Sequence, residues 1–246
     1  SFYYAKNNLS ARSLLSLGVS IIIRFYPLML LPFFIVILGT RFWERVKLVF
    51  WGILPLGLLT ILTRLFPEAA KTGKLTQIPH THYLLTMGFR LGYLNDRVFI
   101  FVALYAVLFL YTLFCTDRSF ASLRRMLLIL LLGVFTTSFF HVHYFVWLVP
   151  FLTLQVVEDR RFIGLFIILV GGWIVYSFQW KEAFAGLLFT PINARYFMSL
   201  PSPFEIINRY YSAARFIGIW RSIFSGVCLW MMYLVLRESM AEKEGR

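Results

Sequence analysis

The feature that most constrains this chain is a set of long segments that contain no charged residue. Asp, Glu, Lys and Arg are absent from Val98–Cys115, from Met126–Val157 and from Phe162–Trp180. A mainly apolar run of about 18 uncharged residues or more is typical of a helix that crosses a lipid bilayer. Only 14% of all residues are charged, whereas soluble domains carry about 25%. We therefore predict a polytopic integral membrane protein and exclude an ordinary soluble domain.

The basic excess of the chain indicates its orientation in the membrane. The formal net charge is +13, from 24 Lys and Arg against 11 Asp and Glu. In a soluble protein this charge would suggest nucleic acid as a partner, but membrane proteins gather Lys and Arg in short cytoplasmic loops. The short connections around Arg45, Arg125 and Arg161 are densely basic, and so is the C-terminal tail. The long connections Arg64–Arg97 and Lys181–Arg221 have a lower density of basic residues, so we predict that they lie outside. Because topology explains the basic charge, we predict no nucleic-acid partner.

Apolar runs and their interruptions predict an all-α transmembrane helical bundle of about eight crossings, with residues 1–246 forming a single transmembrane domain. The charge rule requires Ser13–Gly39 and Met126–Val157 each to begin and end on the same side of the membrane. We therefore predict two short-armed hairpins, with tips at Arg24–Pro27 and His141–Tyr144. The predicted spans are Ser13–Ile23, Phe25–Gly39, Leu48–Thr63, Val98–Cys115, Met126–Phe140, Tyr144–Val157, Phe162–Trp180 and Ser222–Leu236.

Arg24 is the residue of the first hairpin that most directly suggests a ligand. A guanidinium between apolar runs is costly unless it reaches the interface, pairs with another group or binds an anion. Arg offers a planar fork of donors that fits phosphate oxygens, and a lipid phosphate lies near the expected depth of the hairpin tip. The alternative is that Arg24 only extends to the outer headgroups.

All four histidines of the chain fall in two copies of one pattern, His80-Thr-His82 and His141-Val-His143, each followed by a tyrosine. Two pairs of imidazoles could bind zinc. Residues i and i+2 do not share a face of a helix, so each pair would have to be extended or lie at a helix end. Histidines beside tyrosines are also common at the membrane boundary, and we favour that role or contact with a substrate. We assign no metal site and no cofactor, and leave a divalent metal open.

The second long connection contains a segment with helical periodicity. Apolar residues recur at near-helical spacing from Phe204 to Ala214, with Glu205, Asn208 and Arg209 between them. This pattern predicts one helix that lies in the outer membrane interface.

Two stretches resemble elements of the polytopic GT-C-type glycosyltransferases. The first, from Ser20 to Pro32, contains a basic-x-Tyr-Pro…Leu-Pro element, and the second, from His141 to Leu152, contains His-x-x-Tyr-x-x-Trp-x-x-Pro. The similarity is greatest to mannosyltransferases that use a polyprenyl- or dolichyl-phosphate-linked sugar. It covers about Ser13–Val157, with both elements in order and a long outer loop between them.

The resemblance implies inverting transfer of a hexose, with mannose the first choice, from a polyprenyl-phosphate-linked donor to a lipid or glycan acceptor on the outer or lumenal side. It implies that Arg24 binds the donor phosphate, with Tyr26 as its hydrogen-bonding neighbour. The residues that it implies for the edge of the substrate cavity are His141, His143, Tyr144 and Trp147.

The resemblance also implies a carboxylate general base in the first outer loop, after a first transmembrane helix. This chain has no acidic motif at that point, and the acids predicted outside show no paired spacing. They are Glu68, Asp96, Glu182 and Glu205. We leave the catalytic residue unassigned and expect it in sequence that precedes Ser1, which would make this chain the C-terminal part of a longer enzyme.

Two other classes of protein stay open at this point. A membrane transporter or lipid flippase would also have broken helices and an arginine at a half-helix junction, although the chain shows no matching halves. A noncatalytic scaffold subunit of a membrane complex is the third alternative. In every case we expect a multi-pass membrane protein, in the plasma membrane of a prokaryote or the endoplasmic reticulum of a eukaryote.

Overall fold

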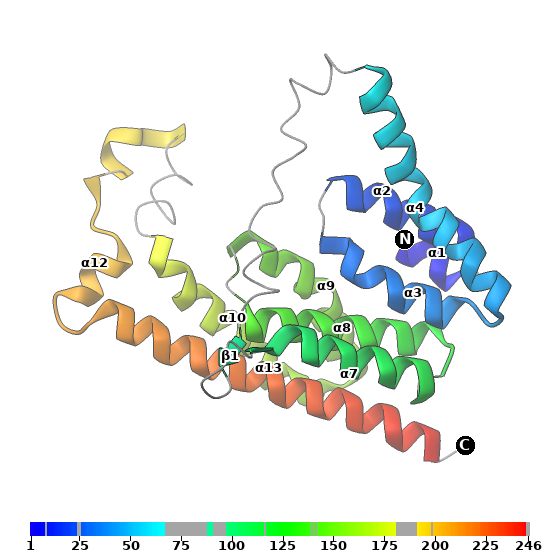
Figure 1. Ribbon diagram of the computed structural model, residues 1–246. Helices are drawn as coiled ribbons and strands as arrows, with labels where there is room; N and C mark the ends of the chain where they lie inside the picture. The colour runs from blue at the N-terminus through cyan, green and yellow to red at the C-terminus, as the bar shows by residue number, and fades with distance from the viewer. Residues whose placement is uncertain are drawn as a thin grey trace. The chain divides into compact units, whose positions relative to one another are not determined.

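The computed structural model describes residues 1–7, 9–23, 26–66, 88–90, 97–115, 117–138, 140, 142–180, 191–197 and 199–244. Nearly all of the described chain is helical, in agreement with the all-α prediction, and one short pair of strands interrupts the series (Figure 1). The chain divides into two compact units, Ser1–Ser138 with Val235–Arg246 and Phe139–Leu234.

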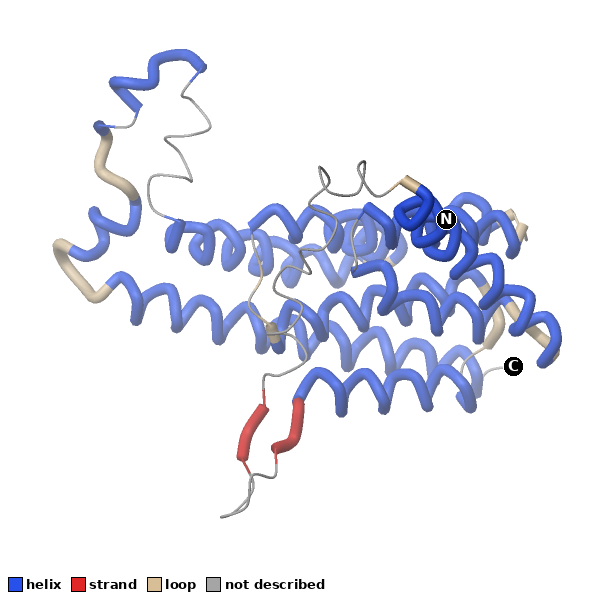
Figure 2. The backbone as a smooth tube through the Cα atoms, turned by 45° about the horizontal axis from the view of Figure 1, so that its top comes forward, coloured by secondary structure: helices blue, strands red, loops and turns tan. Residues whose placement is uncertain are grey.

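The first unit contains the helices up to residue 138 and a two-stranded hairpin. β1 and β2 pair antiparallel with Phe89 opposite Val98, and they are the red segments of Figure 2. The elements are α1 (Phe2–Lys6), α2 (Ser10–Ile23), η1 (Tyr26–Leu30, a 3₁₀ turn), α3 (Leu31–Leu38), α4 (Phe42–Leu65), β1 (Gly88–Arg90), β2 (Arg97–Phe99), α7 (Ile100–Cys115) and α8 (Phe120–Thr137).

The second unit contains three longer helices and several short turns. α13 (Ala213–Glu244) begins in this unit, and its last turns, from Val235, belong to the first. The other elements are η2 (Val142–Tyr144), α9 (Phe145–Glu158), η3 (Arg160–Phe162), α10 (Ile163–Ser177), η4 (Phe178–Trp180) and α12 (Pro203–Asn208).

Within the described residues, four helical segments are long and apolar enough to cross a membrane. They are Phe42–Leu65, Phe120–Thr137, Arg160–Trp180 and Ala213–Ala241. Four shorter apolar segments, Ser10–Ile23, Pro27–Leu38, Ile100–Phe114 and Val142–Glu158, correspond to the other predicted spans. These segments support a membrane protein, while the count of eight crossings stays a prediction because half of the segments are short for a bilayer of about 30 Å.

Both long apolar runs that we expected to turn back are interrupted near the expected position. α2 ends at Ile23 and the chain resumes as the 3₁₀ turn Tyr26–Leu30, which contains Pro27. Proline lacks an N–H and its ring clashes with the preceding helical turn, so a continuous helix is disfavoured here. α8 ends at Thr137, and the turn Val142–Tyr144 precedes α9.

Close contact between α2 and α4 organises the first unit (Figure 1). A Cβ atom built on Gly18 of α2 would overlap the carbonyl oxygen of Gly52 in α4 and would lie 2.9 Å from Cγ of Pro55. The absence of a side chain at Gly18 therefore sets how near the two backbones come. Leu14 and Leu17 of α2 are fully buried beside this crossing.

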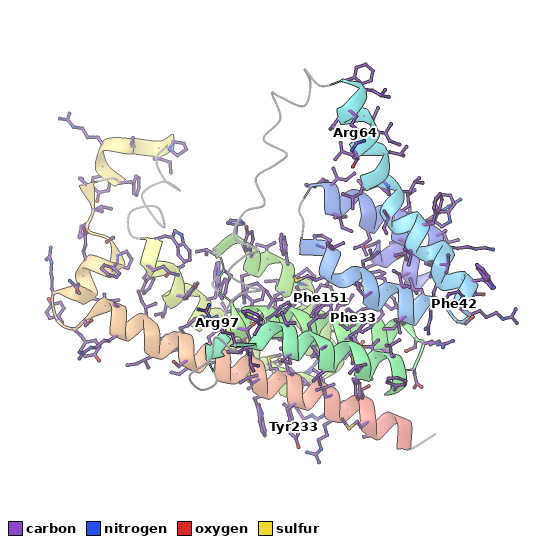
Figure 3. The ribbon with its side chains drawn as sticks, in the orientation of Figure 1. Phe33, Phe42, Arg64, Arg97, Phe151 and Tyr233 are labelled. Carbon is purple, nitrogen blue, oxygen red and sulfur yellow. The ribbon has the colours of Figure 1, made fainter. Side chains whose placement is uncertain are left out.

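α3 and α7 meet through aromatic side chains in the same unit. The ring of Phe33, labelled in Figure 3, is buried and lies edge-on to Tyr105 and Phe109, at centroid distances of 5.4 and 6.1 Å. Edge-to-face pairs at such distances are favourable because the positive edge of one ring faces the negative face of the other.

Three long helices begin well before the position that we predicted from hydropathy. α4 begins at Phe42 rather than Leu48, and Oε2 of Glu44 in its first turn accepts hydrogen bonds from the backbone N–H groups of Thr40 and Arg41, at 2.9 and 3.1 Å. α8 begins at Phe120 rather than Met126, and α13 begins at Ala213 rather than Ser222. The basic residues near the starts of these helices are thus helical, and hydropathy predicted only the apolar parts.

The predicted interfacial helix from Phe204 to Ala214 is wrong as a single element. α12 covers Pro203–Asn208, and a turn separates it from α13. Ser202 caps α12, because its Oγ accepts from the N–H of Glu205 while Oε2 of Glu205 accepts from the N–H of Ser202. This reciprocal capping box favours a helix that begins at Pro203. Helical periodicity alone does not indicate where a helix ends, so the end of α12 at Asn208 was not predicted.

Candidate functional site

The structure describes only part of the predicted site. Arg24 and His141 lie outside the described residues, as do His80 and His82 of the other histidine pair. The backbone of Tyr26 begins the turn η1, and Phe25 separates it from Arg24 in the sequence. Three predicted residues remain with described side chains, and all three belong to the second unit.

His143, Tyr144 and Trp147 lie together at the start of α9. The rings of Tyr144 and Trp147 stack with an interplanar angle of 24° and centroids 5.0 Å apart, and the ring of His143 lies edge-on to Tyr144 at 4.3 Å. Tyr144 is buried, Trp147 is half-buried and His143 is exposed. His143 belongs to the 3₁₀ turn that precedes α9. The geometry of the His141–His143 pair stays a prediction, because His141 lies outside the described residues.

A second aromatic pair fixes the turn that carries His143. Phe145 stacks on Trp173 of α10, with centroids 5.3 Å apart and an interplanar angle of 17°. The indole Nε1–H of Trp173 donates to the carbonyl oxygen of Val142 at 2.9 Å. This hydrogen bond joins the turn that carries His143 to α10.

Sequence reasoning missed Arg221, which the structure brings into an aromatic cluster. Cζ of Arg221 lies 5.1, 5.4 and 5.5 Å from the ring centroids of Phe140, Tyr176 and Phe224, within the range of cation–π interactions. Its Nη1 donates to Oγ of Ser225 at 3.2 Å. We had assigned Arg221 to the end of a loop, but it is half-buried in the third turn of α13.

The rings around Arg221 pack together with the two rings that hold η2. We call this group the aromatic cluster and define it as Phe140, Phe145, Trp173, Tyr176 and Phe224. Phe140 contacts Tyr176 and Phe224 at centroid distances of 4.6 and 5.8 Å, and Phe145 lies 6.3 Å from Phe224. The His143 turn and Arg221 therefore share a single aromatic support within the second unit.

Gly172 allows α10 to approach this cluster closely. A Cβ atom at Gly172 would lie 3.2 Å from Cβ and Cδ2 of Phe224, which is tighter than most contacts in proteins. At the neighbouring Gly171 a Cβ would meet nothing within 4 Å. Of these two glycines, only Gly172 packs tightly against α13.

In the first unit, one hydrogen bond holds the turn that follows Arg24. The hydroxyl of Tyr105 in α7 donates to the carbonyl oxygen of Met29 in η1 at 3.0 Å. The aromatic contacts of Tyr105 with Phe33 and Phe101 orient its ring. The break in the first apolar run is thereby attached to a neighbouring helix.

The acidic residues predicted outside offer no described catalytic pair. Glu205 is used to cap α12, and Glu68, Asp96 and Glu182 lie outside the described residues. Among the side chains that the structure describes, no group of three or more His, Cys, Asp or Glu could hold a metal ion. The zinc hypothesis depends on His80, His82 and His141, which lie outside the described residues, so it stays untested.

No protein-family model, curated protein or solved structure matches this chain.

Proposed function

We propose that this chain belongs to a membrane-embedded glycosyltransferase that moves a hexose, with mannose as the first choice, from a polyprenyl-phosphate-linked donor to a lipid or glycan acceptor. The observation that carries the proposal is the position of the two family-like elements. Each coincides with an interruption of an apolar helical run, at Tyr26–Leu30 and at Val142–Tyr144. The protein would be multi-pass, in the plasma membrane of a prokaryote or the endoplasmic reticulum of a eukaryote.

An interrupted helix within a membrane protein supports such chemistry for a physical reason. Main-chain groups that leave a helix must find other partners, so irregular backbone is tolerated only inside protein or along a water-containing cavity. A transferase for a lipid-linked sugar needs such a place, because the donor phosphate and the sugar hydroxyls are polar while the lipid tail is not. In the sequence Arg24 lies just before the first interruption, separated from it by Phe25. In this proposal its guanidinium stabilises the charge of the departing phosphate.

The second interruption carries polar and aromatic side chains of the kinds that contact sugars, and this supports the proposal. The exposed imidazole of His143 is a hydrogen-bonding group, and the stacked rings of Tyr144 and Trp147 hold it at the helix start. Aromatic rings with polar tips bind the apolar faces of sugars while leaving hydroxyls to polar neighbours. In this proposal His141, His143, Tyr144 and Trp147 contact the sugar or the acceptor, and the catalytic base stays unassigned.

The test is transfer of radiolabelled mannose from polyprenyl-phosphate-mannose in membranes that contain the intact protein. We expect Arg24→Ala to lower transfer by about 100-fold or more, because removal of a group that stabilises transition-state charge has this effect in other enzymes. Arg12→Ala is the matched control, since Arg12 is an exposed arginine of the preceding helix, and it should transfer at the wild-type rate.

Equal transfer rates and donor affinities for wild type and Arg24→Ala would disprove the phosphate role. Absence of transfer with several polyprenyl-phosphate-linked sugars would favour a transporter or lipid flippase, which uptake or lipid scrambling in proteoliposomes would then detect. The same assay with and without EDTA reports whether a divalent metal is needed, and we propose that none is.

A further inference from the structure

The connection between α3 and α4 in the first unit brings together basic residues that are distant in sequence. Nη1 of Arg118, which precedes α8, donates to the carbonyl oxygen of Thr40 at 2.8 Å. Nε of Arg45, in the first turn of α4, donates to the carbonyl oxygen of Gly39 at 3.1 Å. Two guanidinium groups are thus held on adjacent carbonyl groups. We call this place the basic corner and define it as Gly39, Thr40, Arg41, Arg45, Lys47 and Arg118.

The backbone of the basic corner is held in one shape by local contacts. Oε2 of Glu44 accepts from the N–H groups of Thr40 and Arg41, and also from the hydroxyl of Thr40. A Cβ atom at Gly39 would lie 2.7 Å from Cγ of Arg45, so Arg45 can fold across residue 39 only because no side chain is present there. A site that is ordered before binding loses less conformational freedom when a ligand arrives.

The positive charge of the basic corner is accessible from outside the protein. Within the described residues, the bond to Thr40 is the only hydrogen bond of Arg118, so most of the five N–H donors of its guanidinium face solvent. Glu44 and Asp117 are the acidic residues beside the four basic ones, which leaves a formal net charge of +2. The exposed basic residues are Arg41, Lys47 and Arg118, and the half-buried one is Arg45.

Two exposed aromatic residues lie beside this charge at the start of α4. Phe42, labelled in Figure 3, and Trp43 have 73% and 72% of their surface exposed. Trp43 and Lys47 are four residues apart, so they share a face of the helix. Aromatic residues at the end of a membrane helix lie at the level of the lipid headgroups, and clusters of Lys and Arg at that level attract anionic lipids. A headgroup that lies against exposed side chains needs no cavity.

We propose that the basic corner binds the headgroup phosphate of an anionic phospholipid, which in the predicted topology belongs to the cytoplasmic leaflet. Arg45 and Arg118 donate to the phosphate oxygens, because guanidinium groups form strong charge-assisted hydrogen bonds with phosphate. Arg41 and Lys47 add to the attraction. The inference does not depend on the proposed sugar transfer, because it uses residues of another surface and another ligand.

The experiment measures binding of fluorescent short-chain phosphatidylglycerol to the intact protein in a neutral detergent. We expect Arg118→Gln and Arg45→Gln each to weaken binding about fivefold, the usual contribution of one basic residue near anionic lipid. Arg64→Gln is the matched control, because Arg64 is an exposed arginine at the opposite end of α4 (Figure 3). It should bind as the wild type does, and an equal loss in Arg64→Gln would overturn the site in favour of attraction by total charge.

Arg118→Lys keeps the test decisive if Arg45→Gln does not fold. Arg118 is exposed, so neither of its variants disturbs the buried helices, and both should unfold at the wild-type temperature in the absence of lipid. We expect the lysine variant to retain more affinity than Arg118→Gln, because it keeps the charge. Wild-type affinity in Arg118→Gln would overturn the proposal, and so would equal losses in the lysine and glutamine variants.

Two further probes identify the chemistry of the ligand. Phosphatidylcholine contains the same phosphate with a compensating cation, and we expect it to bind weakly and without dependence on Arg118. Equal Arg118 dependence for phosphatidylcholine would overturn the choice of an anionic lipid. Displacement of labelled phosphatidylglycerol by millimolar inorganic phosphate at constant ionic strength would assign the corner to free phosphate and overturn the lipid. No sugar is present, so none of these results changes the standing of the transferase.

Discussion

The hydroxyl of Tyr105 illustrates how one polar atom can hold an interrupted helix in place. It donates to the carbonyl oxygen of Met29, in the 3₁₀ turn that follows Arg24. Tyr105→Phe removes this hydrogen bond and keeps the ring contacts with Phe33 and Phe101. We expect the free energy of unfolding to fall by about 1 kcal/mol, the usual net value of an intramolecular hydrogen bond. Thermal unfolding of the purified protein measures the change.

Tyr105→Leu is the comparison that separates the hydroxyl from the ring. This variant loses the aromatic contacts as well, and its thermal midpoint should lie below that of Tyr105→Phe. If Tyr105→Phe unfolds at the wild-type temperature, the contact with Met29 contributes nothing to stability and η1 is held by packing alone.

At the same scale, the sequence allowed some site residues to be predicted and others not. The family resemblance grouped His143, Tyr144 and Trp147 at the edge of a cavity. Their rings lie together because the residues are close in sequence, while the cavity itself stays a prediction. Arg221 lies against the rings of Phe140 and Tyr176, which are distant in sequence, so residue spacing could not indicate this contact. One signal was present, since Arg221 lies among apolar residues at helical spacing, but hydropathy alone assigned it to a loop edge.

Among the elements, the crossing of α2 and α4 depends on Gly18, because a larger residue at this position would not fit between the two backbones. A Cβ at Gly18 would overlap backbone, namely the carbonyl oxygen of Gly52, so one helix must move. Membrane helices use small residues at such crossings because close packing is their main source of attraction. We expect Gly18→Ala to lower the free energy of unfolding by about 1–3 kcal/mol, the range for overpacked interiors.

Gly57→Ala in α4 is the matched control for this prediction. A Cβ there meets nothing within 4 Å, so the same chemical change should leave the thermal midpoint of the purified protein nearly unaltered. Similar losses in both variants would mean that the helix backbone, rather than the crossing, responds to the substitution.

The elements also show why hydropathy finds spans more reliably than helix ends. Apolar runs predicted the central part of each of the longer apolar helices, because hydropathy depends on side-chain composition. The first turns of α4 and α13 contain Arg45, Lys47 and Arg215, which are compatible with a helix although they reduce its hydropathy. The two breaks were predicted from the charge distribution, with Pro27 as added support for the first. Proline alone would not have predicted them, because Pro55 and Pro150 lie inside α4 and α9.

For the whole molecule, the apolar helices support a membrane protein, and the charge distribution predicts its orientation. Positive-inside reasoning assigns the short loops to the cytoplasm and the long connections to the outside. The same reasoning requires Met126–Val157 to turn back at His141–Tyr144. The break before α9 is compatible with this path, but a broken helix can also continue across the membrane, so orientation must be measured separately from helix geometry.

Single cysteines in a background with Cys115→Ser and Cys228→Ser measure that orientation. Arg118→Cys and Val157→Cys flank the predicted hairpin at exposed positions, and Tyr210→Cys lies in the second long connection with 88% of its surface exposed. We expect a membrane-impermeant maleimide to label Tyr210→Cys in intact cells or sealed lumen-side-out vesicles. Arg118→Cys and Val157→Cys should react only after the membrane is permeabilised. Labelling of Arg118→Cys and Val157→Cys from opposite sides would make Met126–Val157 a single crossing. His143 would then lie within the bilayer, whereas the proposed sugar transfer requires it at the outer surface.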